Sequence, residues 1–165
     1  MSALRERVGI AEIKVATAPT VLVSYGLGSC LGIALYDAEI KIGALAHTML
    51  PYFRAGIRET RTSKFVDMAL QEMIELLQHQ GAEPNRLRAK LVGGANMFAD
   101  APGTGRSSEG IGSRNIQAAH AILGELGIPL LAEDTGGNNG RTMEFDLENG
   151  VVSVLSVRNH DRVIL

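Results

Sequence analysis

Cys30 is the one cysteine of the chain, and it directly follows a glycine-rich bend, Gly26-Leu27-Gly28-Ser29. A lone cysteine is most often a small buried apolar residue. Its position after the bend favours another interpretation, because backbone amides at such a bend can stabilise a thiolate or an oxyanion. We therefore interpret Cys30 as a candidate nucleophile and assign Gly28 and Ser29 to the loop that would hold the oxyanion and meet the substrate.

A free thiol titrates near ~8.5, so a nucleophilic cysteine needs a base beside it. His47 is the candidate, on the grounds of strand register. The apolar runs 31–36 and 42–49 are predicted to pair antiparallel across a turn at residues 37–40, which places Cys30 opposite His47. Directly opposed Cβ atoms lie about 4.5–5.5 Å apart, within reach for a thiol and an imidazole. The alternative for His47 is a core histidine hydrogen-bonded to backbone.

Ser24 stands six residues before Cys30, at the end of the predicted strand that enters the bend. A hydroxyl there would fix the tautomer and orientation of the imidazole, without a negative charge to stabilise an imidazolium. The alternative is an ordinary strand or turn serine. Glu133 and Asp134 could line the same site or simply open a turn. Arg141, after a second glycine-rich loop, could bind a carboxylate or cap that loop.

Two kinds of site are not predicted. The four histidines are widely spaced, and none forms a recognised metal-binding pattern with another ligand. The bend before Cys30 lacks the third glycine and the following helix of a dinucleotide-binding motif. We therefore expect no metal and no other cofactor.

Composition limits the function classes further. The chain has 165 residues, of which 45% are apolar and 21% charged, and its formal net charge is −2. This balance offers no basic field for nucleic acid or acidic lipid. The apolar runs are far shorter than the ~20 residues of a membrane-spanning helix, so no direct membrane insertion is expected. A single cysteine excludes an intramolecular disulfide. We expect one cytoplasmic domain over residues 1–165.

The elements that must position these residues follow from periodicity. Apolar residues at helical spacing predict helices over residues 63–80 and 113–126. Between and around them, strands are predicted near residues 13–15, 20–25, 31–36, 42–50 and 87–92, from 130 on, and in a hairpin at Asn149-Gly150. The long Gly- and Ser-rich loop 100–112 is a candidate functional loop. This order predicts an α+β layered sandwich with mixed β-sheets and two main helices.

Several segments, in one order along nearly the whole chain, closely resemble the CheD family of chemoreceptor glutamine deamidases. They are Gly26-Leu27-Gly28-Ser29-Cys30, Gly43-Ala44-Leu45-Ala46-His47, Met49-Leu50-Pro51, Gly93-Gly94-Ala95-Asn96-Met97-Phe98, Ile111-Gly112-Ser113-Arg114-Asn115, Ala132-Glu133-Asp134-Thr135-Gly136-Gly137 and Gly140-Arg141. In that family the cysteine is the nucleophile and the histidine the base, which correspond here to Cys30 and His47. The third residue is usually threonine, and Ser24 keeps its hydroxyl.

The resemblance implies a fold and an activity. The fold is an α/β/β sandwich similar to the toxins that deamidate Rho proteins. The activity is hydrolysis of glutamine side chains to glutamate on the cytoplasmic bundle of methyl-accepting chemotaxis receptors. It also implies binding to CheC, a phosphatase of the response regulator CheY, and recruitment to receptor arrays. Phe98 is a candidate partner-binding residue, since an aromatic at the mouth of a loop is a common hot spot, or it is a core plug beneath that loop.

Two alternatives to this function come from other classes. The chain could be a catalytically idle binding partner of CheC or receptors, which would tolerate the loss of Cys30. It could also be a thiol redox sensor, although the chain has no second cysteine to resolve an oxidised Cys30.

Overall fold

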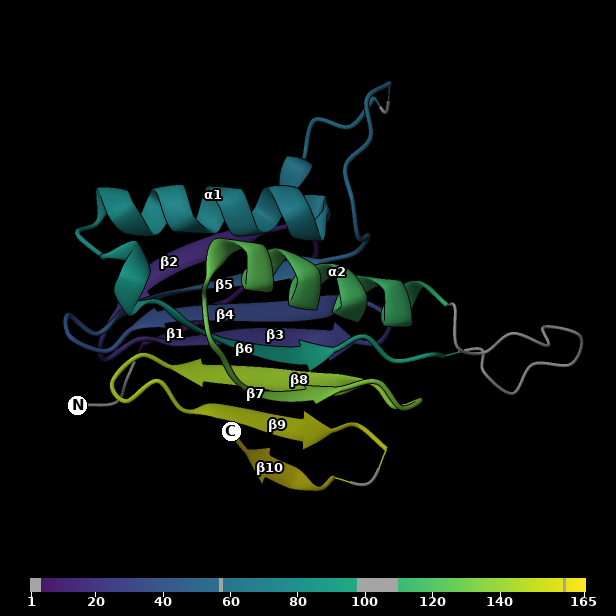
Figure 1. Ribbon diagram of the computed structural model, residues 1–165. Helices are drawn as coiled ribbons and strands as arrows, with labels where there is room; N and C mark the ends of the chain where they lie inside the picture. The colour runs from purple at the N-terminus through teal and green to yellow at the C-terminus, as the bar shows by residue number, and fades with distance from the viewer. Residues whose placement is uncertain (1–3, 57, 98–109, 159) are drawn as a thin grey trace, which may run out of the picture.

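The computed structural model describes residues 4–56, 58–97, 110–158 and 160–165, and Figure 1 shows them as ten strands and two α-helices. The strands are β1 (Arg5–Arg7), β2 (Ile13–Thr17), β3 (Val21–Leu27), β4 (Leu31–Asp37), β5 (Ile42–Thr48), β6 (Arg88–Gly93), β7 (Leu130–Thr135), β8 (Arg141–Asp146), β9 (Val152–Ser156) and β10 (Arg162–Ile164). The helices are α1 (Val66–His79) and α2 (Ile111–Leu126), with short 3-10 helices at Thr62–Lys64 and Pro84–Arg86.

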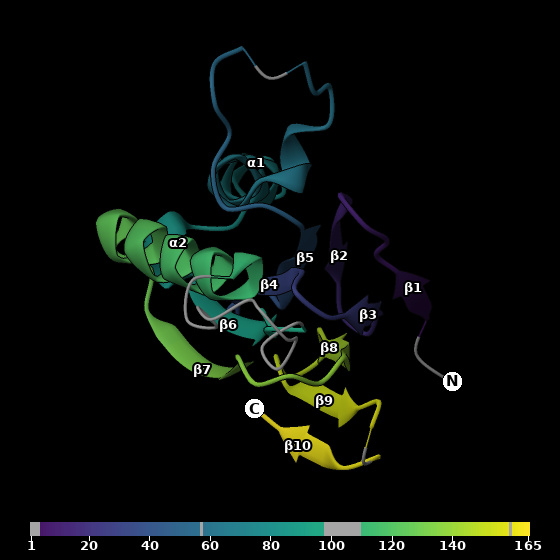
Figure 2. The ribbon, with the colours of Figure 1, turned by 90° about the vertical axis from the view of Figure 1, so that its right-hand side faces the viewer.

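The strands form two five-stranded sheets. One, in the order β2-β5-β4-β6-β7, is covered by both helices and is called the central sheet (Figure 2). The other, in the order β1-β3-β8-β9-β10, packs on its opposite face and is called the outer sheet. Each sheet is mixed, with one parallel pair, β6 with β7 and β1 with β3. The predicted α+β layered sandwich is confirmed.

Strands β4 and β5 read as continuous apolar runs because both of their faces are covered. Leu31, Ile33 and Leu35 pack against the helices. The alternate residues, such as Ala34, pack against the outer sheet. His47 belongs to the same alternating series of β5 as Leu45, which packs in the core between the two sheets. Side chains alternate along a strand, so the His47 ring also points between the sheets.

The helices begin close to the predicted positions. The predicted helix 63–80 is a 3-10 turn followed by α1, because Phe65 adopts an extended backbone between them. Helix α2 begins at Ile111, two residues earlier than predicted, and ends at Gly127 in a left-handed conformation. A glycine adopts that conformation without a steric cost.

The predicted register of β4 and β5 is wrong by two residues, because the turn begins one residue later than predicted. The turn occupies residues 38–41, so Asp37 still pairs with Ile42, and His47 lies opposite Gly32 rather than Cys30. The reason is Asp37, which is fully buried and accepts hydrogen bonds from the amides of Glu39 and Glu83. Arg86 completes its surroundings with an ion pair of 2.8 Å. Asp37 is therefore fixed as the last strand residue, and the turn starts after it.

Candidate active site

Cys30 lies in the bend between β3 and β4, half-buried against the core between the sheets. Its carbonyl accepts a hydrogen bond of 2.9 Å from the Gly94 amide. The Ala95 amide likewise donates to the Gly28 carbonyl at 2.8 Å. The cysteine loop is thus held on its backbone by the segment that follows β6, so the thiol is presented from a fixed support.

Gly93 makes that contact possible. Its backbone has φ of +110°, and a Cβ atom there would stand 2.4 Å from the Cys30 carbonyl oxygen. Real Cβ atoms do not approach backbone oxygens so closely, and L-residues with side chains rarely adopt this φ. The end of β6 therefore needs glycine in order to pass beside the cysteine loop.

His47 is 1% exposed. Within the described chain, neither ring nitrogen meets the geometry of a hydrogen bond, and the alternative of a core histidine hydrogen-bonded to backbone rests only on the nearby Val8 carbonyl. Burial is the largest influence on its pKa and lowers it below the ordinary histidine value. The nearby carbonyl of Val8 raises the pKa by a smaller amount. His47 is therefore neutral at neutral pH, the state in which an imidazole can accept a proton.

Cys30 lies just before β4, close to the end of the ladder that contains His47. Gly32 faces His47 across the ladder, and Cys30 lies two residues before Gly32. Burial raises the pKa of the Cys30 thiol. At rest the thiol and the imidazole are therefore both neutral.

Ser24 is fully buried on β3. Its hydroxyl donates a hydrogen bond of 2.9 Å to the Val8 carbonyl, and the direct hydrogen bond to His47 that the sequence suggested is not formed. The Val8 carbonyl is also the one that raises the pKa of His47. Ser24 is thus linked to the imidazole only through the Val8 carbonyl, which lies in the segment that follows β1.

Only some backbone amides of the loop assigned to oxyanion binding are available as donors. The Gly28 amide donates to the Gly26 carbonyl at 3.0 Å, so it is already used. In the part of the chain that the structure describes, the Ser29 and Cys30 amides donate to no backbone carbonyl. Those two amides remain the candidate oxyanion donors.

Sequence reasoning gave no role to Asn115, which sits on the first turns of α2 and is fully buried. Its side-chain amide donates to the Ser29 carbonyl and to the Met49 carbonyl, each at 3.0 Å. One side chain therefore joins the residue before Cys30 to the strand end just after His47. The signal that could have found it is a polar residue on the apolar stripe of an amphipathic helix.

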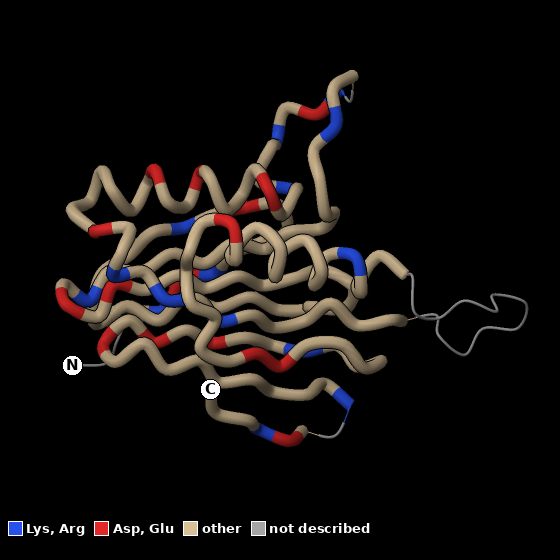
Figure 3. Tube along the Cα trace, in the orientation of Figure 1, with Lys and Arg blue, Asp and Glu red and all other residues tan. Residues whose placement is uncertain are grey.

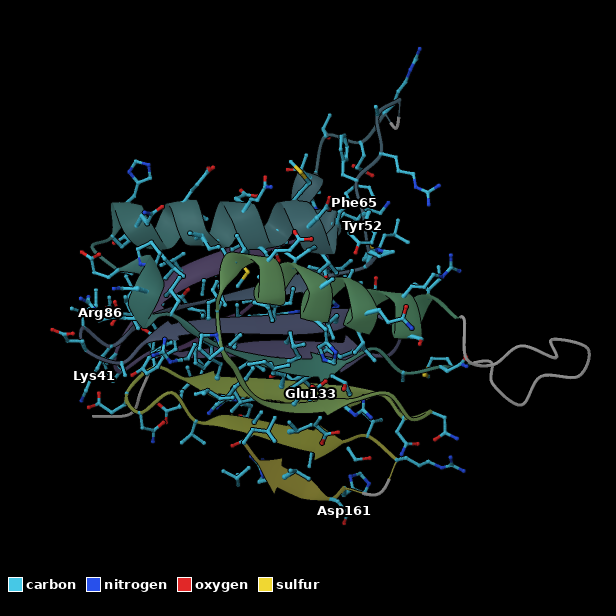
Figure 4. The ribbon with its side chains drawn as sticks, viewed as in Figure 1. Lys41, Tyr52, Phe65, Arg86, Glu133 and Asp161 are labelled. Carbon is cyan, nitrogen blue, oxygen red and sulfur yellow. The ribbon has the colours of Figure 1, made fainter. Side chains whose placement is uncertain are left out.

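Arg141 caps the glycine loop, the second of its two predicted alternatives. Its guanidinium donates to the carbonyls of Gly93 at 3.0 Å and Gly136 at 2.6 Å, and it lies 3.4 Å from a carboxylate oxygen of Asp134. Glu133 is exposed on the surface, where its carboxylate is hydrogen-bonded to His120 and Thr135 (Figure 4). Arg141 therefore supports the end of β6 through the Gly93 carbonyl.

The remaining candidate, Phe98, lies outside the described residues.

Among the residues that are described, no group of three or more His, Cys, Asp or Glu side chains could hold a metal ion. Neither α1 nor α2 is long and apolar enough to span a membrane.

The fold is similar to that of a solved structure. The crystal structure of Neisseria meningitidis protein NMB0706 matches 82% of this chain with a TM-score of 0.52 and 17% identity. This chain spans 65% of that protein's length, and at this identity the likeness concerns the fold alone. The shared class is an α+β sandwich of helices on two mixed sheets.

Sequence comparison is more specific. Residues 49–156 match the model of the CheD family, described as chemotactic sensory transduction. The chain is 52% identical over 92% of its length to the probable chemoreceptor glutamine deamidase CheD 2 of Geobacter metallireducens, covering 93% of that protein. It is 46% identical to the probable chemoreceptor glutamine deamidase CheD of Clostridium novyi, covering 92% of each chain. This protein belongs to the CheD family.

Proposed function

We propose that this protein hydrolyses glutamine side chains of methyl-accepting chemotaxis receptors to glutamate, with release of ammonia. The proposal draws on the names of relatives at 46–52% identity. The structural observation that carries it is the position of Cys30 just before β4, two residues from Gly32, which is the ladder partner of His47. Cys30 is the proposed nucleophile and His47 the proposed base.

In the first step the Cys30 sulfur adds to the amide carbon of the glutamine side chain. His47 accepts the thiol proton as the carbon–sulfur bond forms, and the amides of Ser29 and Cys30 donate to the developing oxyanion. The imidazolium then gives its proton to the departing nitrogen, the carbon–nitrogen bond breaks and ammonia leaves. A γ-glutamyl thioester remains on Cys30.

In the second step a water molecule replaces ammonia. Neutral His47 takes a proton from the water as its oxygen attacks the thioester carbon. The carbon–sulfur bond of the tetrahedral intermediate then breaks, glutamate leaves, and the imidazolium returns its proton to the Cys30 sulfur. The lowered pKa of His47 suits this step, because the imidazole returns to its neutral form after each transfer. Ser24 is proposed as a positioning residue that acts on His47 through the Val8 carbonyl.

The test uses a purified cytoplasmic receptor fragment with its glutamines unmodified. Incubation with the protein is expected to release ammonia and to convert specific glutamines to glutamate, as seen by mass spectrometry of peptides. The same experiment with Cys30→Ala is the control. No conversion by the unaltered protein would overturn the proposed activity.

Binding to a CheC-type phosphatase is proposed on the family resemblance, with recruitment to cytoplasmic receptor arrays. The alternative of an idle regulatory partner makes a different prediction for the same variant. An idle partner would bind the phosphatase or receptor with Cys30→Ala as before and would show no deamidation in either form.

A further inference from the structure

A groove opens beside the segment that follows β5. It has a volume of about 240 Å³ and is lined by Leu50, Pro51, Tyr52, Arg54, Phe65, Ile111 and Arg114. Its floor is apolar, and two of its apolar side chains are unusually accessible: Tyr52 is 45% exposed and Ile111 41%. Figure 4 shows Tyr52 and Phe65 side by side at the N-terminal end of α1.

The rim of this groove is basic. Arg54 and Arg114 are exposed, and neither guanidinium has a hydrogen bond or ion pair within the described chain. The nearby carboxylates are already engaged: Glu59 pairs with Lys64 at 3.1 Å, and Asp67 accepts from the Phe53 amide at 3.0 Å. Figure 3 shows Lys and Arg segments in the loop above α1 and at the start of α2.

The start of α2 adds to this positive potential. Its N-cap residue, Gly110, offers no side-chain hydrogen bond, and its first turn contains no acidic residue. The N-terminal end of a helix carries a partial positive charge that favours anions. Arg114 is the fourth residue of α2 and lines the groove. The helix N-terminus and the Arg114 guanidinium therefore both attract negative charge.

The groove and Cys30 share one support. Asn115, next to Arg114, donates to the Met49 carbonyl beside Leu50 and to the Ser29 carbonyl beside Cys30. The groove wall is therefore tied to the cysteine loop through a single buried side chain.

We propose that this groove binds an acidic segment of the protein substrate next to the target glutamine. An apolar side chain of that segment would contact Tyr52 and Ile111, and carboxylates on either side would meet Arg54 and Arg114. This inference rests on the proposed function and adds its determinant of specificity. Charge complementarity selects the occupant: unpaired arginines around an apolar floor favour an acidic, partly apolar polypeptide over a basic one.

The experiment compares Arg54→Glu, Arg114→Glu and the double variant with a matched charge reversal, Lys41→Glu. Lys41 lies in the β4–β5 turn at the opposite end of the molecule (Figure 4), in an exposed ion pair with Glu148. Steady-state deamidation of the receptor fragment is expected to show KM raised roughly tenfold by each groove variant, with kcat changed less than about twofold. Lys41→Glu should leave KM unchanged. Added salt should raise KM for the unaltered protein more than for the double variant.

Several outcomes would overturn the inference. One is an unchanged KM in the double variant, and another is an equal rise with Lys41→Glu. A third is loss of binding to a CheC-type phosphatase with no effect on the receptor, which would assign the groove to that partner. If the unaltered protein deamidates nothing, the proposed function fails. Fluorescence anisotropy with a labelled receptor fragment then tests separately whether the groove binds the receptor. Salt-sensitive binding that the double variant loses would still support the groove, and binding that it retains would reject it.

Discussion

Gly32 lies directly opposite His47 in the β4–β5 ladder, and a Cβ atom at Gly32 would stand 2.6 Å from the Met143 sulfur. The ladder position facing the imidazole therefore carries no side chain. Cys30 comes two residues before Gly32, just ahead of β4, and is half-buried against the same core between the sheets. This relationship sets the expectations for the variants below.

Cys30→Ala is expected to abolish deamidation, because no other thiol exists to form the thioester. His47→Ala should lower kcat by about 100- to 10,000-fold, the usual contribution of a general base. Neither change removes a side-chain hydrogen bond seen in the structure, so both proteins should fold. Ammonia release and circular dichroism check the two halves of this prediction, and turnover of receptor glutamines by Cys30→Ala would refute the mechanism.

The pH dependence follows from two shifted pKa values. Since burial lowers the pKa of His47, the acid limb of kcat/KM should fall below the ordinary histidine value of about 6.5. Since burial raises the pKa of Cys30, alkylation by iodoacetamide should keep accelerating above the pKa of a free cysteine. A titration of Cys30 near or below neutral pH would instead reveal a thiolate–imidazolium pair in the resting protein.

The same His47 shift affects stability. Below about pH 6.5 the unfolded chain binds a proton at this histidine, while the folded protein does so only at a lower pH. The free energy of unfolding should therefore decrease as pH falls from about 6.5 towards the folded-state pKa of His47. Urea titrations between neutral pH and pH 5 should show a smaller decrease in the free energy of unfolding for His47→Gln. The same dependence of this free energy on pH in both proteins would contradict the prediction.

Ser24→Ala removes the hydrogen bond to the Val8 carbonyl, and one such neutral bond contributes about 0.5–1.5 kcal/mol. Turnover should fall by roughly three- to tenfold and leave measurable activity. Ser24→Thr keeps the donor and restricts its rotamer, so it should match or modestly exceed the unaltered protein. Steady-state ammonia assays on both variants test this, and full activity of Ser24→Ala would leave only Cys30 and His47 in the site.

Asn115 offers a test of how the cysteine loop is held. Asn115→Asp keeps the shape of the side chain but loses both donors when ionised, and it would place a carboxylate against the Ser29 and Met49 carbonyls. We expect kcat to fall at least as far as in Asn115→Ala, with a stability loss of about 1–3 kcal/mol for the unpaired carbonyls. Thermal melts and kcat measurements distinguish this from a packing role, in which Asn115→Asp would be close to neutral.

The sequence by itself determined the class of this fold and singled out Cys30 and His47 as candidate site residues. Helical periodicity fixed α1 and α2 to within a few residues, and continuous apolar runs marked β4 and β5 because both faces of those strands are buried. Cys30 stood out because a reactive side chain followed a bend of glycines. Strand β10 escaped notice, because its residues are exposed and only their pairing with β9 makes them a strand.

What the tertiary structure decided is how the site residues meet. Strand register depends on where the turn begins, and that was set by Asp37 through contacts with Glu83 and Arg86, residues far along the chain. The same holds for Asn115, whose two acceptors lie 86 and 66 residues away. Local periodicity carries no information about such contacts, because they form only when separate elements pack together.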